Sequence, residues 1–268
     1  MDGRLHLLIS GDRRVMPGLE ALVYSTMKHN RNVVWHLFTM EVQIDHGDGT
    51  GTGYYGITEE DAEWLRRIVR FMDADSDLIR YDVRDLYLEQ LDGSVNRSTG
   101  FTPYAGLRLL ADLILDVDCC MYLDADIIVQ GDLRPPYERC RRAGSDYAAY
   151  TIPDACDGFG ELISAVLVLN LRNIRRSGFL ARARRYYNRE RYTYPDQMAL
   201  AAAGDPEPLE ETYNYMKDHK LAEYRPVVLH FSNNNKFKLY NTQPGVFYRY
   251  YPEHRYIKEG LDLIRTAH

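Results

Sequence analysis

Apolar runs alternate with amphipathic segments along the first quarter of the chain, and this alternation constrains the fold more than any other feature. Leu5–Ser10 (LHLLIS) is an apolar run typical of a strand, and residues 18–29, opened by Pro17, have the character of a helix. Residues 33–42 (VVWHLFTMEV) predict a second strand, and residues 58–72 begin with a Thr-x-x-Asp pattern typical of a helix start. The alternation predicts an α/β protein.

The middle of the chain continues this pattern after one interruption. Residues 45–56 (DHGDGTGTGYYG) are rich in glycine but lack the Lys-Ser/Thr of a phosphate-binding loop, so we expect a flexible insertion. A strand is expected over residues 78–83 and a polar loop over residues 89–100. Residues 101–116 predict an amphipathic helix through their regularly spaced leucines.

Length and composition limit the classes of protein to consider. The chain has 268 residues, of which 45% are hydrophobic and 27% charged, and this is too apolar for a disordered chain. We expect one large domain over residues 1–240 and a tail over residues 241–268. The formal net charge of −6 excludes a surface built throughout to bind nucleic acid, so an anionic ligand needs local cations or a metal ion.

Cysteine usage and the absence of targeting signals predict a cytoplasmic protein. The four cysteines show no metal-binding pattern, and we expect them to be reduced and structural. The first residues, MDGRLHLLIS, do not resemble a signal peptide, and no apolar stretch reaches the roughly 18 residues of a membrane span. The Asn96-Arg97-Ser98 glycosylation sequon is then expected to be coincidental.

Two carboxylates stand where an α/β sheet binds its ligands. The segment CCMYLDADIIVQGDL consists of a buried strand, then Asp124-Ala125-Asp126, then a second apolar run. Ligands of open α/β sheets bind at the carboxyl ends of strands, and aspartates two residues apart on extended backbone point to the same side. An Asp-x-Asp alone is more often a solvated turn, but unpaired charges between two apolar runs would be costly. We therefore predict that Asp124 and Asp126 bind one hard cation.

A histidine at the end of another apolar strand completes the candidate metal site. Residues 227–231 (VVLHF) place His230 at a strand end, and the following SNNNK segment contains Lys236. An imidazole and two carboxylates suit Mn²⁺ or Mg²⁺, and Lys236 can meet a phosphate as a point charge. The alternative is a core histidine bonded to a backbone carbonyl.

An ordered series of these segments resembles the retaining family 8 glycosyltransferases, the group that includes glycogenin and bacterial lipopolysaccharide galactosyltransferases. The series spans roughly residues 4 to 240, and its order and spacing are far more specific than the Asp-x-Asp alone. It comprises the first strand with Asp12, then TPYAGLRLLADLILDVDCCMYLDADIIVQGDL, SAVLVLNL, YPDQMAL, TYNYM and HFSNNNK.

The resemblance implies a GT-A fold, a single α/β domain with a central, mostly parallel sheet flanked by helices. It also implies transfer of a hexose, glucose or galactose, from a UDP-linked nucleotide-sugar donor, and Mn²⁺ as the cofactor, with Mg²⁺ as the alternative ion. The implied roles are metal ligation by Asp124, Asp126 and His230; contact with the donor by Ala125, Asp124 and Arg108; phosphate contact by Lys236; a hydrogen bond from the base to Asp12; sugar hydroxyl binding by Asp196; and a place beside the anomeric carbon for Gln197.

These residue types suit glycosyl transfer with retention of configuration. A divalent cation and Lys236 can neutralise the departing nucleoside diphosphate, so no strong acid is required. Gln197 is a neutral amide and a poor nucleophile, which argues against a covalent intermediate. We favour attack by the acceptor hydroxyl on the same face as the leaving group, with Gln197 stabilising the oxocarbenium-like charge and the departing phosphate taking the proton.

Departures from the family pattern keep a second interpretation open. Val15 ends the Arg13-Arg14-Val15 segment where the family has an aromatic that stacks on uracil, and Ile163 replaces an asparagine before the apolar strand. After His230, Asn233 and the Lys-Phe-Lys segment from Lys236 replace the usual Gly and Lys-Pro-Trp. The alternative is a family member that binds a nucleotide sugar without transferring it. A glycoside hydrolase is discounted, because its two carboxylates must flank the scissile bond.

The acceptor and the tail are the least determined parts of the chain. The acceptor is expected to be a glycan, a lipid-linked glycan or a small molecule, with residues 45–57 and 85–101 shaping the choice and with no nucleic acid partner. The tail mixes aromatic and basic residues (FYRYYPEHRYIKEG). It could dock on the inner face of a membrane as a peripheral contact or on an acceptor. The alternative, a tyrosine-rich helix packed on the domain, is favoured by composition.

Overall fold

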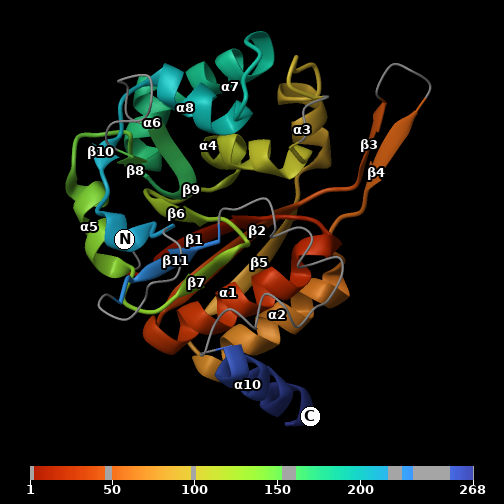
Figure 1. Cartoon of the computed structure of the whole chain (residues 1–268), viewed down its shortest axis with the longest axis vertical. Coiled ribbons are helices and arrows are strands. Elements are labelled where there is room, and N and C mark those ends of the chain that lie inside the picture. The colour runs from red at the N-terminus through yellow and green to blue at the C-terminus, as the bar shows by residue number, and fades with distance from the viewer. Residues whose placement is uncertain are drawn as a thin grey trace.

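The computed structural model describes residues 3–45, 50–97, 101–152, 161–216, 225–231 and 254–267. A seven-stranded sheet runs through the centre of the molecule (Figure 1), in the order β10-β8-β9-β6-β1-β2-β5. Its strands are β1 (Leu5–Ser10), β2 (Val33–Thr39), β5 (Asp77–Asp82), β6 (Cys120–Leu123), β8 (Tyr147–Ile152), β9 (Glu161–Leu169) and β10 (Glu207–Pro208).

Most neighbouring strands of this sheet are parallel, as the sequence predicts. Strand β1 pairs in parallel with β2 and β6, β2 pairs in parallel with β5, and β10 pairs in parallel with β8. Strand β9 runs antiparallel to β6 and β8. Every residue of β1 and β2 is buried, as expected for strands that helices cover on both faces.

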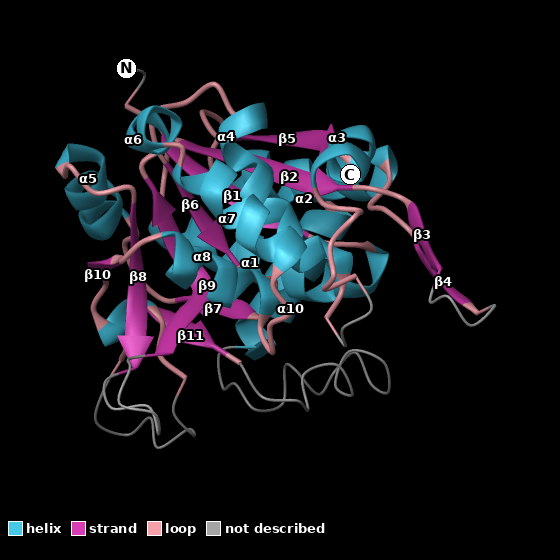
Figure 2. Cartoon of the chain, turned by 90° about the horizontal axis from the view of Figure 1, so that it is seen from above, coloured by secondary structure: helices cyan, strands magenta, loops and turns pink. Residues whose placement is uncertain are grey.

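Helices cover the two faces of the sheet and form two hydrophobic cores (Figure 2). Alternate residues of β1 lie in the two cores: Leu7 packs with the helices α1 (Met16–His29) and α2 (Glu59–Met72), and Leu8 packs in the core on the other face of the sheet. The helices are α1 (Met16–His29), α2 (Glu59–Met72), α3 (Arg84–Gln90), η2 (Pro103–Leu110), α4 (Ala111–Ile114), α5 (Arg134–Arg142), α6 (Leu171–Ser177), α7 (Phe179–Arg189) and α8 (Pro195–Ala203).

The predicted start of α2 is confirmed. The Thr58 side chain accepts a hydrogen bond from the backbone N–H of Asp61, and the Asp61 carboxylate accepts one from the backbone N–H of Thr58. This reciprocal capping box satisfies two N–H groups that a helix start leaves without partners. Pro17 lies in the first turn of α1, as expected.

Two predictions for the second strand and its insertion are wrong in part. Strand β2 ends at Thr39, and β3 (Val42–Asp45) then pairs antiparallel with β4 (Gly51–Tyr54), so that a projecting hairpin occupies much of the predicted flexible insertion (Figure 1). The side chains of Val42 and Ile44 are buried, which gives the hairpin an inner face. The alternation of Val42 and Ile44 with polar residues is the period-two signal that the glycine content concealed.

The predicted amphipathic helix over residues 101–116 is also wrong in part. The chain forms the 3₁₀ helix η2 followed by the single turn α4. Leu107, Leu109 and Leu110 are all buried, so the leucines do not define one helical face, and Leu113 is exposed. A Cβ atom at Gly106 would lie 3.1 Å from the Tyr187 hydroxyl oxygen, which shows how closely this segment packs on α7. Close burial on several sides has overridden the α-helical spacing.

The C-terminal helix α10 (His254–Thr266) packs against α1 and α2. Leu261 and Ile264 are buried there, and Arg265 lies 3.5 Å from the Glu20 carboxylate and over the Trp64 ring. Residues 241–253 of the predicted tail lie outside the described residues. Among the described residues, no helix is both long and apolar enough to cross a membrane.

Three cysteines are free and buried, in agreement with the prediction that they are reduced and structural, and the sequon asparagine is engaged within the fold. Cys119, Cys120 and Cys140 are free thiols and buried, while Cys156 lies outside the described residues. Asn96 is also buried, and its side-chain amide donates hydrogen bonds to the backbone oxygens of Tyr187 and Glu190. This amide is engaged within the fold.

Candidate active site

Asp124 and Asp126 lie at the edge of the sheet where β6 ends. The backbone N–H of Asp124 donates to the Ala165 oxygen of β9 over 2.9 Å. The chain turns at Ala125 and Asp126 before β7 (Ile127–Val129), so the predicted extended backbone between the two aspartates is wrong. The turn still leaves both carboxylates beside each other, because the two strands hold its ends.

Strand β11 (Val228–His230) brings the third predicted metal ligand to this turn. It pairs antiparallel with β7, so that His230 lies opposite Ile127, and the backbone N–H of Phe231 donates to the backbone oxygen of Asp126. More than a hundred residues of sequence separate the two segments. The sheet thus joins the two apolar runs from which the sequence predicts a common site.

The three predicted ligands form one cluster. Ligand atoms of Asp124, Asp126 and His230 all lie within 4.8 Å of one another, and His230 Nε2 lies 3.7 Å from Asp126 Oδ2. Asp126 and His230 are buried, at 4% and 9% exposure. Ligand atoms about 2.1 Å from one ion lie roughly 3 Å apart when adjacent and roughly 4 Å apart when opposite. The spacing of the cluster is therefore close to that of a single divalent site.

Arg108 and Tyr122 hold Asp124 by the same oxygen. Arg108 Nη2 donates to Asp124 Oδ1 over 2.8 Å, and the Tyr122 hydroxyl donates to that oxygen over 2.7 Å. The Arg108 guanidinium stacks over the Tyr122 ring at 3.9 Å. Both bonds end on Oδ1, so Oδ2 is the less engaged oxygen of Asp124.

Arg108 also links the cluster of Asp124, Asp126 and His230 to the first turn of α8. Its Nε lies 3.4 Å from Asp196 Oδ2, and its guanidinium also donates to the backbone oxygen of Ser164. Burial raises the pKa of Asp196, and the nearby Arg108 opposes this rise. Neighbouring carboxylates raise the pKa of Arg108 despite its burial, so it stays charged. One buried cation thus serves Asp124 and Asp196 together.

Gln197 is fixed beside Asp196 by strand β9. Its Oε1 accepts a hydrogen bond from the backbone N–H of Ser164 over 3.2 Å, and its Nε2 donates to Glu161 Oε1 over 3.3 Å. The Ser164 hydroxyl donates to Asp196 Oδ2 over 3.2 Å. Strand β9 therefore orients both predicted catalytic side chains.

Comparison with known proteins identifies the fold. No protein-family model matches the chain, and no curated protein matches its sequence. Solved structures do match. The galactosyltransferase LgtC, in complex with donor and acceptor sugar analogues, aligns with a TM-score of 0.64 and 15% identity over 98% of this chain and 97% of its own. Mouse xyloside xylosyltransferase 1 aligns with a TM-score of 0.63 and 13% identity over 86% of this chain and 98% of its own.

The chain has the GT-A fold. The glycosyltransferase GlyE of Streptococcus pneumoniae TIGR4 also matches, with a TM-score of 0.63 and 18% identity over 98% of this chain. This chain spans 64% of the length of GlyE and 52% of that of the bifunctional glycosyltransferase WbbM. At identities this low, the structural likeness shows the fold alone, and the chemistry depends on the residues of the site.

The Asp12 carboxylate is paired with Arg14. It caps the 3₁₀ helix η1 (Arg13–Val15): Oδ1 accepts from the backbone N–H of Arg14, and Oδ2 accepts from Arg14 Nε over 2.6 Å. The Arg14 guanidinium lies over the Tyr54 ring at 5.0 Å. Beside this pair is an open hollow lined by Asp12, Arg13, Arg14, Gly53 and Tyr55. Any further donor to Asp12 would have to share these oxygens with Arg14 or displace its side chain.

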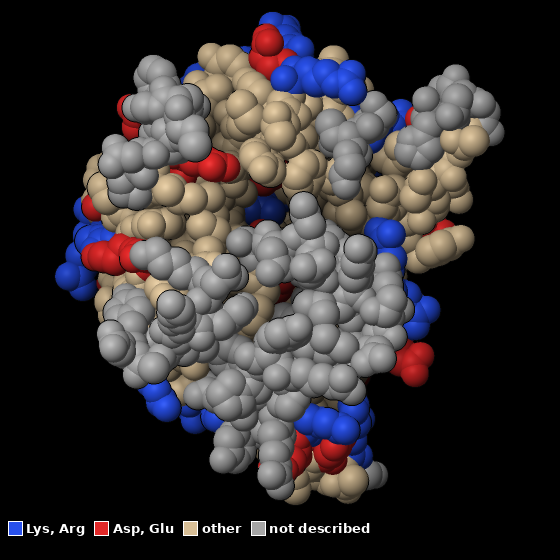
Figure 3. All heavy atoms as spheres, in the orientation of Figure 1, with Lys and Arg blue, Asp and Glu red and all other residues tan. Residues whose placement is uncertain are grey.

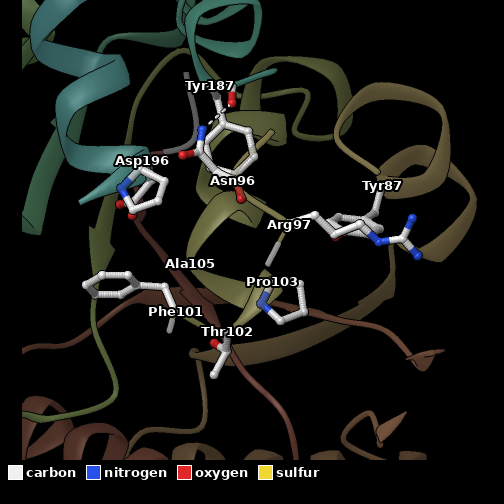
Figure 4. Close-up of a pocket in the computed structure, with 10 residues that line it drawn as sticks. Tyr87, Asn96, Arg97, Phe101, Thr102, Pro103, Ala105, Tyr187 and Asp196 are labelled. Carbon is white, nitrogen blue, oxygen red and sulfur yellow. Dashed lines mark hydrogen bonds between the residues drawn. The ribbon is translucent and has the colours of Figure 1, made fainter. Parts of the chain in front are cut away.

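A second hollow is lined in part by Asp196 (Figure 4). Asp196 and Phe101 lie at one end of it, and Arg97 and Tyr87 at the other. Phe101 packs edge-on against Tyr194, with ring centroids 5.7 Å apart, and both rings are exposed, at 43% and 45%. Tyr194 of this exposed aromatic pair lies two residues before Asp196, at the start of α8.

Sequence reasoning missed four residues that orient the site. Tyr122 lies within an apolar run and was predicted only as part of a buried strand. Glu161 begins a strand, and its partner Gln197 comes 36 residues later. Ser164 and Asn214 lie in segments that resemble the family, but nothing local marks their contacts. Lys236, by contrast, was predicted and lies outside the described residues, as does Asn233.

The two departures near the site are placed differently from each other. Val15 is partly buried and packs on the core that contains α1, where its side chain also contacts Gly11. Ile163 is buried in the same core, and its backbone oxygen accepts a hydrogen bond from Asn214. The Ile163 side chain is therefore a core side chain in this GT-A fold.

Proposed function

We propose that this chain is a metal-dependent, retaining glycosyltransferase of family 8 that transfers a hexose, glucose or galactose, from a UDP-sugar to a hydroxyl acceptor. The observation that carries the proposal is the cluster of Asp124, Asp126 and His230 at the carboxyl edge of a GT-A sheet. Ligands of open α/β sheets bind at this edge, outside the ends of the strands.

The residues of the cluster fit a divalent cation. Two carboxylate oxygens and one imidazole nitrogen form a mixed set that suits Mn²⁺ better than Ca²⁺, which prefers oxygen ligands alone. When bound, the ion would neutralise charge on a diphosphate leaving group. We propose that Ala125, in the turn between the two aspartates, borders the donor, and that Lys236 contacts its phosphates.

The side chains around Arg108 are proposed to hold the transferred sugar. Asp196 accepts hydrogen bonds from sugar hydroxyls, and Arg108 keeps this buried carboxylate and that of Asp124 in place. The Oε1 of Gln197 uses one lone pair for the backbone N–H of Ser164, and its other lone pair faces the positive charge that develops at the anomeric carbon. The acceptor hydroxyl attacks from the leaving-group face, and its proton passes to the departing phosphate.

The identity of the sugar is part of the proposal. Structures with this fold include a galactosyltransferase and a xylosyltransferase, so the fold accommodates more than one sugar. A variant of LgtC replaces an active-site glutamine with glutamate, and a glutamine beside the reacting carbon is what we propose for Gln197. We propose Asp12 as the acceptor of a hydrogen bond from the base, after displacement of Arg14.

The surface and the cysteines support the remaining proposals. On the face seen in Figure 3, described basic side chains are interspersed with acidic ones, which favours a sugar-based acceptor over nucleic acid. Buried free thiols at Cys119, Cys120 and Cys140 favour a reducing compartment such as the cytoplasm. We propose residues 1–240 as the catalytic domain and residues 241–268 as a tail, whose helix α10 packs on that domain and whose basic and aromatic residues contact a membrane or an acceptor.

One observation favours the second candidate, a protein that binds a nucleotide sugar without transferring it. Both oxygens of Asp12 already bond to Arg14, so the base subsite differs from the one that the family resemblance implies. The hydrogen bonds that orient Asp196 and Gln197 favour transfer, because binding alone does not require an oriented amide at the anomeric carbon.

Donor turnover distinguishes these candidates. UDP-glucose, UDP-galactose, UDP-N-acetylglucosamine and GDP-sugars are incubated with the protein in Mn²⁺ or in chelator, and released nucleoside diphosphate is measured, with Asp126→Ala as the control. Release from a UDP-hexose that requires both Mn²⁺ and Asp126 is expected. Metal-dependent binding without release would support the second candidate, and release that is unaffected by chelator would refute the metal site.

A further inference from the structure

The imidazole of His230 has a buried amide neighbour. Its Nδ1 lies 3.1 Å from Oδ1 of Asn214, whose side chain is completely buried. Asn214 follows the 3₁₀ helix η3 (Glu211–Tyr213) and stands outside the candidate metal ligands. A neutral imidazole has one N–H and one lone pair, so this neighbour bears directly on which ring nitrogen can meet an ion.

A second hydrogen bond fixes the orientation of the Asn214 amide. Its Nδ2 lies 3.3 Å from the backbone oxygen of Ile163, which can only accept. The nitrogen of the amide must therefore face Ile163, and its oxygen must face His230 Nδ1. Because Oδ1 can only accept, the proton of the imidazole belongs on Nδ1, and the lone pair belongs on Nε2.

The backbone also ties Asn214 to the strand that carries His230. The backbone N–H of Tyr215, the next residue, donates to the Val228 oxygen, and the backbone N–H of His230 donates to the Tyr215 oxygen over 3.0 Å. Asn214 itself donates from its backbone to Glu211. These bonds leave little freedom for the distance between the amide and the imidazole.

We propose that Asn214 is a positioning residue that holds His230 as the Nδ1–H tautomer, with the Nε2 lone pair directed at the metal cluster. Nε2 is the nitrogen that lies 3.7 Å from Asp126 Oδ2. The opposite tautomer would point an N–H at the ion position and would set the Nδ1 lone pair against Asn214 Oδ1. Histidine ligands commonly have their other nitrogen bonded in this way. The metal part of the inference rests on the proposed function, and the tautomer does not.

The tautomer is tested on the metal-free protein by long-range ¹H–¹⁵N correlation spectra with ¹⁵N-labelled histidine. His230 is assigned by the signal that disappears in His230→Gln. The wild-type spectrum is expected to show a proton on Nδ1 alone, and Asn214→Asp keeps this pattern because its carboxylate still accepts. Asn214→Leu loses the acceptor and is expected to show a mixture. A neutral His230 that carries its proton on Nε2 in the wild-type protein would overturn the proposal even if Asn214→Leu does not fold.

Mn²⁺ titration by calorimetry gives the second readout. Asn214→Leu is expected to weaken Mn²⁺ binding by about 10- to 100-fold, the usual loss when a residue behind a metal ligand is removed. Asn214→Asp should weaken it less. Asn188→Leu is the control, because the side-chain amide of Asn188 also donates to a backbone oxygen, that of Gln90, but away from the cluster. Unchanged affinity in Asn214→Leu would refute the positioning role, whereas no binding by the wild-type protein would refute the metal site.

Discussion

Replacement of Arg108 by methionine should destabilise the protein through the two carboxylates left behind. Arg108 is 4% exposed, and its guanidinium lies within 2.8 Å of Asp124 and 3.4 Å of Asp196. Methionine keeps an unbranched apolar side chain over the Tyr122 ring but removes the charge. Asp124 and Asp196 then face each other across a buried space without a cation.

The structure sets the size of this effect. Removing one partner of a buried ion pair costs about 3–5 kcal/mol, and we expect about 3 kcal/mol because the Asp124 side chain is 24% exposed. For a chain of this length, about 2 °C of Tm is lost per kcal/mol, so Tm should fall by about 6 °C. Differential scanning calorimetry without added metal measures this shift.

The loss should shrink as the pH falls. Burial already raises the pKa of Asp196, and Arg108 opposes the rise, so removal of Arg108 raises this pKa further. The folded variant then binds a proton more readily than its unfolded chain, and its stability relative to wild type recovers with falling pH. A difference in Tm that is as large at pH 5 as at pH 7 would contradict this reasoning.

Arg184 provides a matched control. It forms a similarly buried ion pair with Asp112, at 2.6 Å, away from the metal cluster. Arg184→Met should cost a comparable free energy of unfolding but leave Mn²⁺ and nucleotide binding unchanged, whereas Arg108→Met should weaken both. A Tm for Arg108→Met within 2 °C of wild type would refute the role of Arg108 as the shared cation, since about 6 °C is expected.

Single contacts elsewhere lead to three more predictions. Burial, with His6 nearby, lowers the pKa of His36 to about 3. Below the ordinary pKa of histidine, His36 therefore binds a proton in the unfolded chain but not in the folded one. This difference should reduce the free energy of unfolding by about 2 kcal/mol from pH 7 to pH 5. In urea titrations, the free energy of unfolding of His36→Phe should depend less on pH than that of wild type. An equal pH dependence in the two proteins would contradict this role of His36. Gln197→Ala should lower donor turnover by about 100-fold with Mn²⁺ affinity unchanged; near-normal turnover removes Gln197 from the mechanism. Arg14→Ala should release Asp12 and tighten UDP binding by about tenfold in calorimetry, and weaker binding would contradict Asp12 as the base acceptor.

Local signals in the sequence predicted much of the sheet and the cluster of Asp124, Asp126 and His230. Leu5–Ser10 is a buried strand because continuous apolar residues suit a sheet covered on both faces, and Thr58 caps α2 through neighbours three residues away. Asp124 and His230 were recognised because charged or polar groups at the ends of apolar runs need a partner.

What the sequence could not predict depends on distant contacts. Arg108 reaches Asp196 across 88 positions, and Asn214 reaches His230 across 16, through pairings that only the folded sheet creates. The 3₁₀ helix η2 arises because its leucines are buried on several sides, which periodicity alone does not reveal. The pairing of Asp12 with Arg14 is local, but it competes with the role that the family resemblance implies.

The central claim is that Asp124, Asp126 and His230 hold a divalent cation that engages the diphosphate of the donor. The most direct test is a Mn²⁺ titration followed by electron paramagnetic resonance, with and without UDP, on wild type and Asp126→Asn. We predict one Mn²⁺ bound by wild type, tighter binding in the presence of UDP, and loss of both effects in the variant. Binding that ignores UDP, or that Asp126→Asn leaves intact, would contradict the account.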